Sequence, residues 1–148
     1  MMDIMQSSGL NLFLDQNTGQ IRRGSDVVAE SQSPDVRYRK DMVEVLYDQD
    51  ASDHEELYYM YRGLAREKDA IAISEAGLRY DITVIRPGFL GVEFIKTAGH
   101  YHPQKPGTDF TWPEVYEVIS GTAHYLLQKP AQQSSDRIEK VFLVRAES

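Results

Sequence analysis

The sequence predicts a mainly β fold with one helix near the N-terminus. From residue 56 onward, β-branched and aromatic residues gather in short runs, and turn residues separate these runs at the spacing of antiparallel strands. Many short strands joined by turns are typical of an antiparallel barrel or sandwich. Because 148 residues match the usual size of one domain, we expect a single domain over residues 1–148, with an N-terminal extension over about 1–50 and the strands over about 56–148.

The first part of the chain is expected to contain a hairpin and the helix. Residues 10–14 form a short apolar run, and the Asp-Gln-Asn-Thr-Gly sequence at 15–19 is a strong turn signal. Ser33 before Pro34 fits an N-cap followed by the first helical position. The apolar residues that follow recur at roughly helical spacing: Val36, Met42, Val43 and Leu46. The pattern therefore predicts a helix over residues 34–46.

The rest of the chain is expected to form strands. The runs that favour a strand cover residues 57–61, 78–85, 92–101, 114–119, 122–128 and 138–144. Turn residues at 86–88 and 120–121 end two of these runs, and residues 129–136 are expected to be a polar loop.

Composition excludes several functional classes. The chain has no cysteine, so disulfides, thiolate metal sites and cysteine nucleophiles are excluded, and any metal must be held by histidine and carboxylate side chains. The net charge of −7 argues against a general nucleic-acid binder. No apolar run approaches the roughly 18–20 residues of a membrane span, and the N-terminus lacks the pattern of a signal peptide. We expect a cytoplasmic protein with no membrane partner.

One short motif points to a metal site. His100 and His102 are two residues apart, and in a strand this spacing places both imidazoles on the same face, together with Lys96. A returning strand with Glu114 facing the same way, and Tyr116 beside it, would bring a carboxylate to the pair. Two imidazoles and one carboxylate suit Fe²⁺, Mn²⁺, Zn²⁺ or Ni²⁺. The plainer alternative is that such histidines lie on a surface or in a core.

The surrounding residues carry a resemblance to a known family. His100, His102, Glu114 and Gly121 resemble the first cupin motif. The longer stretches T-V-I-R-P-G at 83–88, E-F-I-K-T-A-G-H-Y-H at 93–102 and E-V-Y at 114–116 resemble the cupin-type glucose-6-phosphate isomerases, also called the archaeal type. The resemblance extends to residues 57–61 and to the opening hairpin. It implies a cupin-like antiparallel β-barrel (jelly roll), which we expect to be incomplete because no second cupin motif follows.

The resemblance also implies an activity and a set of roles. It implies a metal-dependent interconversion of glucose 6-phosphate and fructose 6-phosphate, an aldose–ketose isomerisation of glycolysis and gluconeogenesis. By position, one divalent metal ion would be held by His100, His102 and Glu114, and Glu114 is also the candidate general base. The residues that match sugar-phosphate contacts or pocket positions are Thr83, Thr97, Gly99, Tyr58 and Tyr116. Lys96 is a further phosphate candidate, on the strand-face argument alone.

Three alternatives stay open at the level of sequence. The isomerisation can pass through an enediol, with Glu114 as base, or through a hydride shift. The same donor set also fits a cupin Fe²⁺ oxygenase-like enzyme. A chain without the second motif can instead be a non-catalytic sugar-phosphate-binding or oligomerisation fragment. We expect a homodimer in which sheet edges pair.

Overall fold

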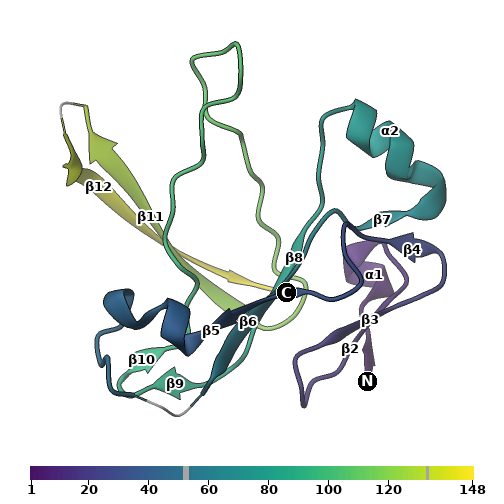
Figure 1. Ribbon diagram of the computed structural model, residues 1–148, viewed down its shortest axis with the longest axis horizontal. Helices are drawn as coiled ribbons and strands as arrows, with labels where there is room; N and C mark the ends of the chain where they lie inside the picture. The colour runs from purple at the N-terminus through teal and green to yellow at the C-terminus, as the bar shows by residue number, and fades with distance from the viewer. Residues whose placement is uncertain (52–53, 133) are drawn as a thin grey trace. The chain divides into compact units, whose positions relative to one another are not determined.

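The computed structural model describes residues 1–51, 54–132 and 134–148, and the chain divides into two compact units, residues 1–101 and 102–148. Strands predominate over helices in both units (Figure 1), so the predicted mainly β class is confirmed. Within the described ranges, the strands form several small antiparallel sheets and no closed barrel. No helix in these ranges is long and apolar enough to span a bilayer.

The first unit opens with the predicted hairpin. Strands β1 (Met2–Asp3), β2 (Leu12–Leu14) and β3 (Ile21–Arg23) form a three-stranded sheet, and α1 (Met5–Ser8) connects the first two. In the turn between β2 and β3, Oδ1 of Asp15 accepts the N–H of Asn17 over 2.9 Å. Gly19 adopts a φ of 74°, a left-handed conformation that favours glycine.

The central sheet of this unit corrects the helix predicted over residues 34–46. Strands β5 (Asp35–Tyr38), β6 (Glu56–Tyr61) and β8 (Ile82–Ile85) form an antiparallel sheet, in which Val36 pairs with Tyr59. The rest of the predicted helix, residues 39–46, contains the two short 3₁₀ turns η1 (Arg39–Asp41) and η2 (Val43–Val45) and no α-helix. Pairing with the aromatic strand β6 outweighs the weak helical spacing of this segment, because local propensity yields readily to tertiary contacts.

Smaller elements complete the unit. Strand β4 (Val27–Val28) pairs with β7 (Ala65–Arg66), and η3 (Glu67–Asp69) leads into a helix that the sequence did not predict, α2 (Ala70–Glu75). The strand predicted from residue 78 begins only at Ile82. The strand predicted over residues 92–101 is wrong beyond its start: β9 (Phe89–Leu90) and β10 (Glu93–Phe94) form a short hairpin, and residues 95–101 belong to no strand.

The core of the first unit contains one of the predicted site residues. Tyr58 is only 3% exposed, and it packs with the buried apolar side chains of this core. The cluster also contains Met42, Leu46, Ala51, Leu57, Leu90 and Ile95. On the other side of β6, the Tyr61 hydroxyl accepts the backbone N–H of Ile21 over 2.7 Å, which ties β3 to the central sheet.

The second unit is built on one long hairpin. Strands β11 (Thr122–Ala131) and β12 (Ser134–Glu147) pair antiparallel (Figure 1), which confirms the strands predicted over 122–128 and 138–144. The loop predicted over 129–136 is wrong where described, because the ladder continues to Ala131; residue 133 lies outside the described residues. The strand predicted over 114–119 is also wrong, since these residues form no strand.

Candidate active site

The second unit brings three of the predicted site residues together. Nε2 of His102 lies 2.8 Å from Oε2 of Glu114, and the Tyr116 hydroxyl donates a hydrogen bond to the same oxygen over 2.6 Å. The side chains of His102 and Glu114 are 26% and 40% exposed, so the group remains open to solvent. The cluster offers one imidazole nitrogen, one carboxylate and one phenol at hydrogen-bonding distance.

A backbone carbonyl that the sequence did not reveal orients His102. Nδ1 of His102 lies 3.1 Å from the carbonyl oxygen of Trp112. Because a carbonyl can only accept, Nδ1 is the donor in this contact, and such a partner is typical of metal-binding histidines. The 2.8 Å contact of Nε2 with Oε2 of Glu114 then requires a proton on one of these two atoms, and loss of that proton leaves the Nε2 lone pair for a metal ion. The residue that follows is Pro113, which restricts Trp112 to an extended backbone. The Trp-Pro pair before Glu114 was the signal available in the sequence.

The loop between His102 and Glu114 is closed by its own contacts. Gln104 and Thr111 form an isolated antiparallel bridge, and the N–H of Lys105 donates to the Phe110 carbonyl over 2.8 Å. The Lys105 ammonium lies 5.0 Å from the centre of the Trp112 ring, within the range of a cation–π interaction. These contacts fix the base of the loop beside the residue that orients His102.

Tyr116 also contacts the hairpin. Its ring centre lies 5.2 Å from that of Tyr125 in β11, with the two planes tilted by 43°. Partial burial, the hydrogen bond to Glu114 and the charge of that carboxylate raise the pKa of Tyr116 well above its ordinary value. The phenol therefore remains a neutral hydrogen-bond donor at neutral pH.

The other predicted ligand and its neighbours lie in the first unit. His100, Thr97 and Gly99 are exposed, and Nδ1 of His100 lies 3.3 Å from the carbonyl oxygen of Ala98. Because residues 95–101 and Glu114 lie outside any strand, the argument that strand alternation aligns the imidazoles with Glu114 is wrong. The described residues of either unit contain no group of three or more histidine, aspartate or glutamate side chains placed to hold a metal ion.

Two of the predicted substrate residues lie on the central sheet. The buried Tyr58 accepts the backbone N–H of Ala98 at its hydroxyl, over 3.2 Å, so the core fixes the start of the segment that carries His100. Thr83 lies in β8 opposite Met60, and its side chain is exposed. Tyr58 thus has a packing role, and Thr83 has a hydroxyl accessible to solvent.

Lys96 connects two segments of the first unit. Its ammonium donates to the Val45 carbonyl over 2.8 Å and forms an ion pair with Glu93 at 2.5 Å. The other oxygen of Glu93 accepts the N–H of Tyr47 over 2.6 Å. Burial alone would raise the pKa of Glu93, but the hydrogen bonds from Lys96 and Tyr47 and the charge of Lys96 outweigh it, so the pKa is lowered.

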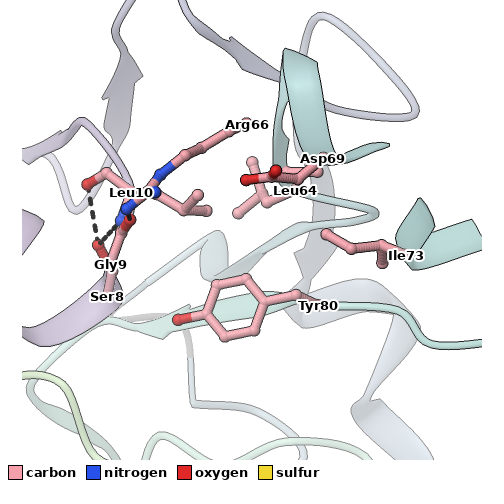
Figure 2. A pocket seen from close by; sticks show the side chains of 9 residues that line it. Ser8, Gly9, Leu10, Leu64, Arg66, Asp69, Ile73 and Tyr80 are labelled. Carbon is pink, nitrogen blue, oxygen red and sulfur yellow. Dashed lines mark hydrogen bonds between the residues drawn. The ribbon is translucent and has the colours of Figure 1, made fainter. Parts of the chain in front are cut away.

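A small pocket lies elsewhere in the first unit, and no predicted site residue lines it. It has a volume of about 220 Å³, and Figure 2 shows the apolar side chains of Leu64 and Ile73 around it together with Tyr80. Arg66 at its edge donates to the Gly9 carbonyl over 2.7 Å. Several of its lining residues belong to α1, β7 and α2, which were not predicted, so the pocket could not be inferred from the sequence.

The comparisons with known proteins place the chain in a family. The fold and site define a mainly β protein with a histidine–glutamate–tyrosine cluster. The model of the glucose-6-phosphate isomerase (GPI) family matches residues 36–148, and the chain belongs to this family. It is 39% identical over 56 residues, 38% of its length, to the glucose-6-phosphate isomerase of Pyrococcus abyssi (strain GE5 / Orsay). The matched segment spans about a quarter (27%) of that relative. No solved structure matches the chain.

Proposed function

We propose that the chain carries the active site of a metal-dependent aldose–ketose isomerase that interconverts glucose 6-phosphate and fructose 6-phosphate. Membership in the isomerase family supports the reaction. The observation that carries the proposal is the 2.8 Å contact between His102 and Glu114, an imidazole and a carboxylate that meet in a site open to solvent. The proposal includes an incomplete cupin-like antiparallel barrel, to which the small antiparallel sheets of the described residues would belong.

The residue types of the proposed donor set suit a divalent metal ion, and in the structure His102 and Glu114 are the two of them in contact. In the proposal His100, His102 and Glu114 hold the metal, and the bond from Nδ1 of His102 to the Trp112 carbonyl leaves Nε2 as its ligand atom. Two imidazoles and one carboxylate suit Fe²⁺, Mn²⁺, Zn²⁺ or Ni²⁺. The metal would supply Lewis acidity to the oxygens at C1 and C2 of the sugar.

The remaining residues would bind the sugar phosphate. In the proposal Thr83, Thr97 and the Gly99 backbone contact the substrate and Tyr116 lines its pocket. The buried Tyr58 contributes to the pocket by holding the backbone N–H of Ala98 at its hydroxyl. Lys96 has three N–H donors, and its contacts with Val45 and Glu93 occupy two of them. The third donor is available to a phosphate oxygen.

Glu114 is proposed to move the proton. A carboxylate beside C1 and C2 can act as general base and pass the proton between them through an enediol. Tyr116 holds Oε2 of Glu114, so it fixes the carboxylate while the proton moves. With Glu114 as base, the product formed in heavy water by the parent chain is expected to contain deuterium, and Glu114→Gln is expected to lose most activity. Product without deuterium would favour the hydride shift.

A coupled assay on the metal-loaded chain tests the activity. We expect conversion of glucose 6-phosphate by the parent chain, loss of at least about a hundredfold in His102→Ala, and activity close to the parent in His124→Ala. His124 is a matched control because it lies exposed in β11. Equal activity in both variants would refute the assigned site. Binding of fructose 6-phosphate without turnover would show a binding module instead of an enzyme.

We further propose that the protein acts in the cytoplasm as a homodimer. The hairpin of β11 and β12 supports the dimer, because a long strand edge can pair with a second copy. Sedimentation equilibrium of the purified chain at several concentrations tests it, with a mass near twice 16.9 kDa as the expected result. A monomer at all concentrations would refute it.

A further inference from the structure

Tyr125 has a fixed place on one face of the hairpin. The register pairs it with Val144, and alternation along β11 places Ala123, Tyr125 and Leu127 on the same face. His124, on the opposite face, is exposed, whereas Tyr125 is partly buried. Because ten residues of β11 take part in the ladder, the backbone of Tyr125 is held by hydrogen bonds on both sides of its position.

The segment that carries Glu114 and Tyr116 has no such support. Residues 113–118 belong to no helix and no strand, so no ladder fixes their backbone. Two side-chain contacts orient Tyr116: its ring packs against Tyr125 at 5.2 Å, and its hydroxyl donates to Oε2 of Glu114. The ring contact lies within the 4.5–7 Å range of favourable aromatic pairs.

These contacts form a continuous path from the hairpin to the candidate ligand. Oε2 of Glu114 receives the Tyr116 hydroxyl and also faces Nε2 of His102. Two partners on one oxygen fix the rotation of the carboxylate, and the position of one of them depends on Tyr125. Replacing Tyr125 is therefore expected to alter the orientation of the Glu114 carboxylate through Tyr116.

We propose that Tyr125 is a positioning residue of the candidate active site, whose ring holds the Tyr116 hydroxyl on Glu114. The inference rests on the proposed function in that Glu114 is taken as a metal ligand and base. The aromatic ring of Tyr125 is the part that acts, since its hydroxyl has no role in the path described. Tyr125→Phe keeps the ring and is therefore expected to preserve this positioning role, whereas Tyr125→Leu is expected to lose it.

Binding of Co²⁺, followed by its visible absorption, tests the proposal without turnover. Tyr125→Leu is expected to weaken Co²⁺ binding by about three- to tenfold, the range that loss of an aromatic pair gives. Tyr125→Phe and the control His124→Leu are expected to stay within about twofold of the parent chain. Circular dichroism and melting temperature confirm that each variant is folded. An unchanged affinity in Tyr125→Leu would overturn the proposal.

A double-mutant cycle separates positioning from a general structural role. If Tyr125 acts through Tyr116, Tyr125→Leu costs little further affinity in a Tyr116→Leu background. An equal loss of Co²⁺ affinity on Tyr125→Leu in the parent chain and in the Tyr116→Leu variant would overturn the proposal.

NMR of the metal-free chain distinguishes failure of the Tyr125 proposal from failure of the proposed isomerase function. The ring signals of Tyr116 are expected to move in Tyr125→Leu and to stay in place in Tyr125→Phe, even if the parent chain shows no isomerisation. Tyr116 signals that do not respond to Tyr125→Leu would overturn the proposal whatever the activity is.

Discussion

Replacing Lys96 by methionine tests the network that joins residues 43–47 to residues 93–96. The change removes the hydrogen bond to the Val45 carbonyl and the ion pair with Glu93, and the aliphatic stem of the side chain is retained. A hydrogen bond to a charged group contributes about 1.5–3 kcal/mol. Because Lys96 is 41% exposed and Glu93 18%, solvent screening reduces the expected loss for the whole network to about 1–2 kcal/mol.

The assay is urea unfolding of Lys96→Met and the parent at neutral pH. The expected loss in the free energy of unfolding would also appear in a separate thermal experiment, as a melting temperature lower by about 2–8 °C. Lys68→Met is the matched control, because it makes the same change at an exposed lysine and is expected to stay within about 0.5 kcal/mol of the parent. An unfolding free energy of Lys96→Met equal to that of the parent would refute the reasoning. An increase in KM for glucose 6-phosphate would separately support the proposed phosphate contact.

The pH dependence gives this prediction a second readout. The folded pKa of Glu93 is lowered from its ordinary value of 4.5, so its stabilising contribution is present above pH 4.5 and is lost as the pH falls through the folded pKa. The difference in stability between the parent and Lys96→Met is therefore expected to shrink as the pH falls below 4.5. A difference that stays constant down to pH 2.5 would contradict the role assigned to this ion pair.

Three further predictions concern the first unit. Leu57→Ala removes a fully buried side chain from the core and is expected to cost about 2–5 kcal/mol in calorimetry; a loss below 1 kcal/mol would contradict the packing described. Tyr61→Phe leaves the Ile21 N–H without its acceptor and is expected to cost about 0.5–1.5 kcal/mol. Burial raises the pKa of Tyr61, although the hydrogen bond from Ile21 opposes this shift. The folded state therefore favours the neutral phenol, so the parent is expected to lose stability as the pH rises above about 10, and Tyr61→Phe is expected to lose less. Arg62→Met breaks the 2.9 Å ion pair with Asp35 and is expected to cost about 1 kcal/mol, less in 1 M salt.

The sequence predicted the parts of the fold that depend on local signals. The turn at Asp15 and Gly19 and the aromatic strand β6 follow from residue types within a few positions of one another. The helix predicted over residues 34–46 failed because the deciding contact, Val36 with Tyr59, is distant in sequence. Such pairings outweigh spacing that is only roughly helical.

The three residues that the structure brings into contact were each singled out from the sequence, but their arrangement was not predicted. His102, Glu114 and Tyr116 were found from motif and resemblance, but the contacts that hold them come from irregular backbone, where alternation does not apply. The group that orients His102 is the main-chain carbonyl of Trp112, and the Pro113 that follows indicates an extended backbone there but not the partner of the carbonyl. Tyr125 could have been found, because alternation along a correctly predicted strand places it on one face of the hairpin.

The closed loop between His102 and Glu114 has a practical consequence. The bridge from Gln104 to Thr111 isolates the residues at the tip, around the exposed Gly107, from the two site residues at its base. Exposed loop tips are the positions at which proteins best tolerate added sequence. A short epitope inserted next to Gly107, with this glycine retained because its φ is 76°, is therefore expected to leave the contact between His102 and Glu114 in place.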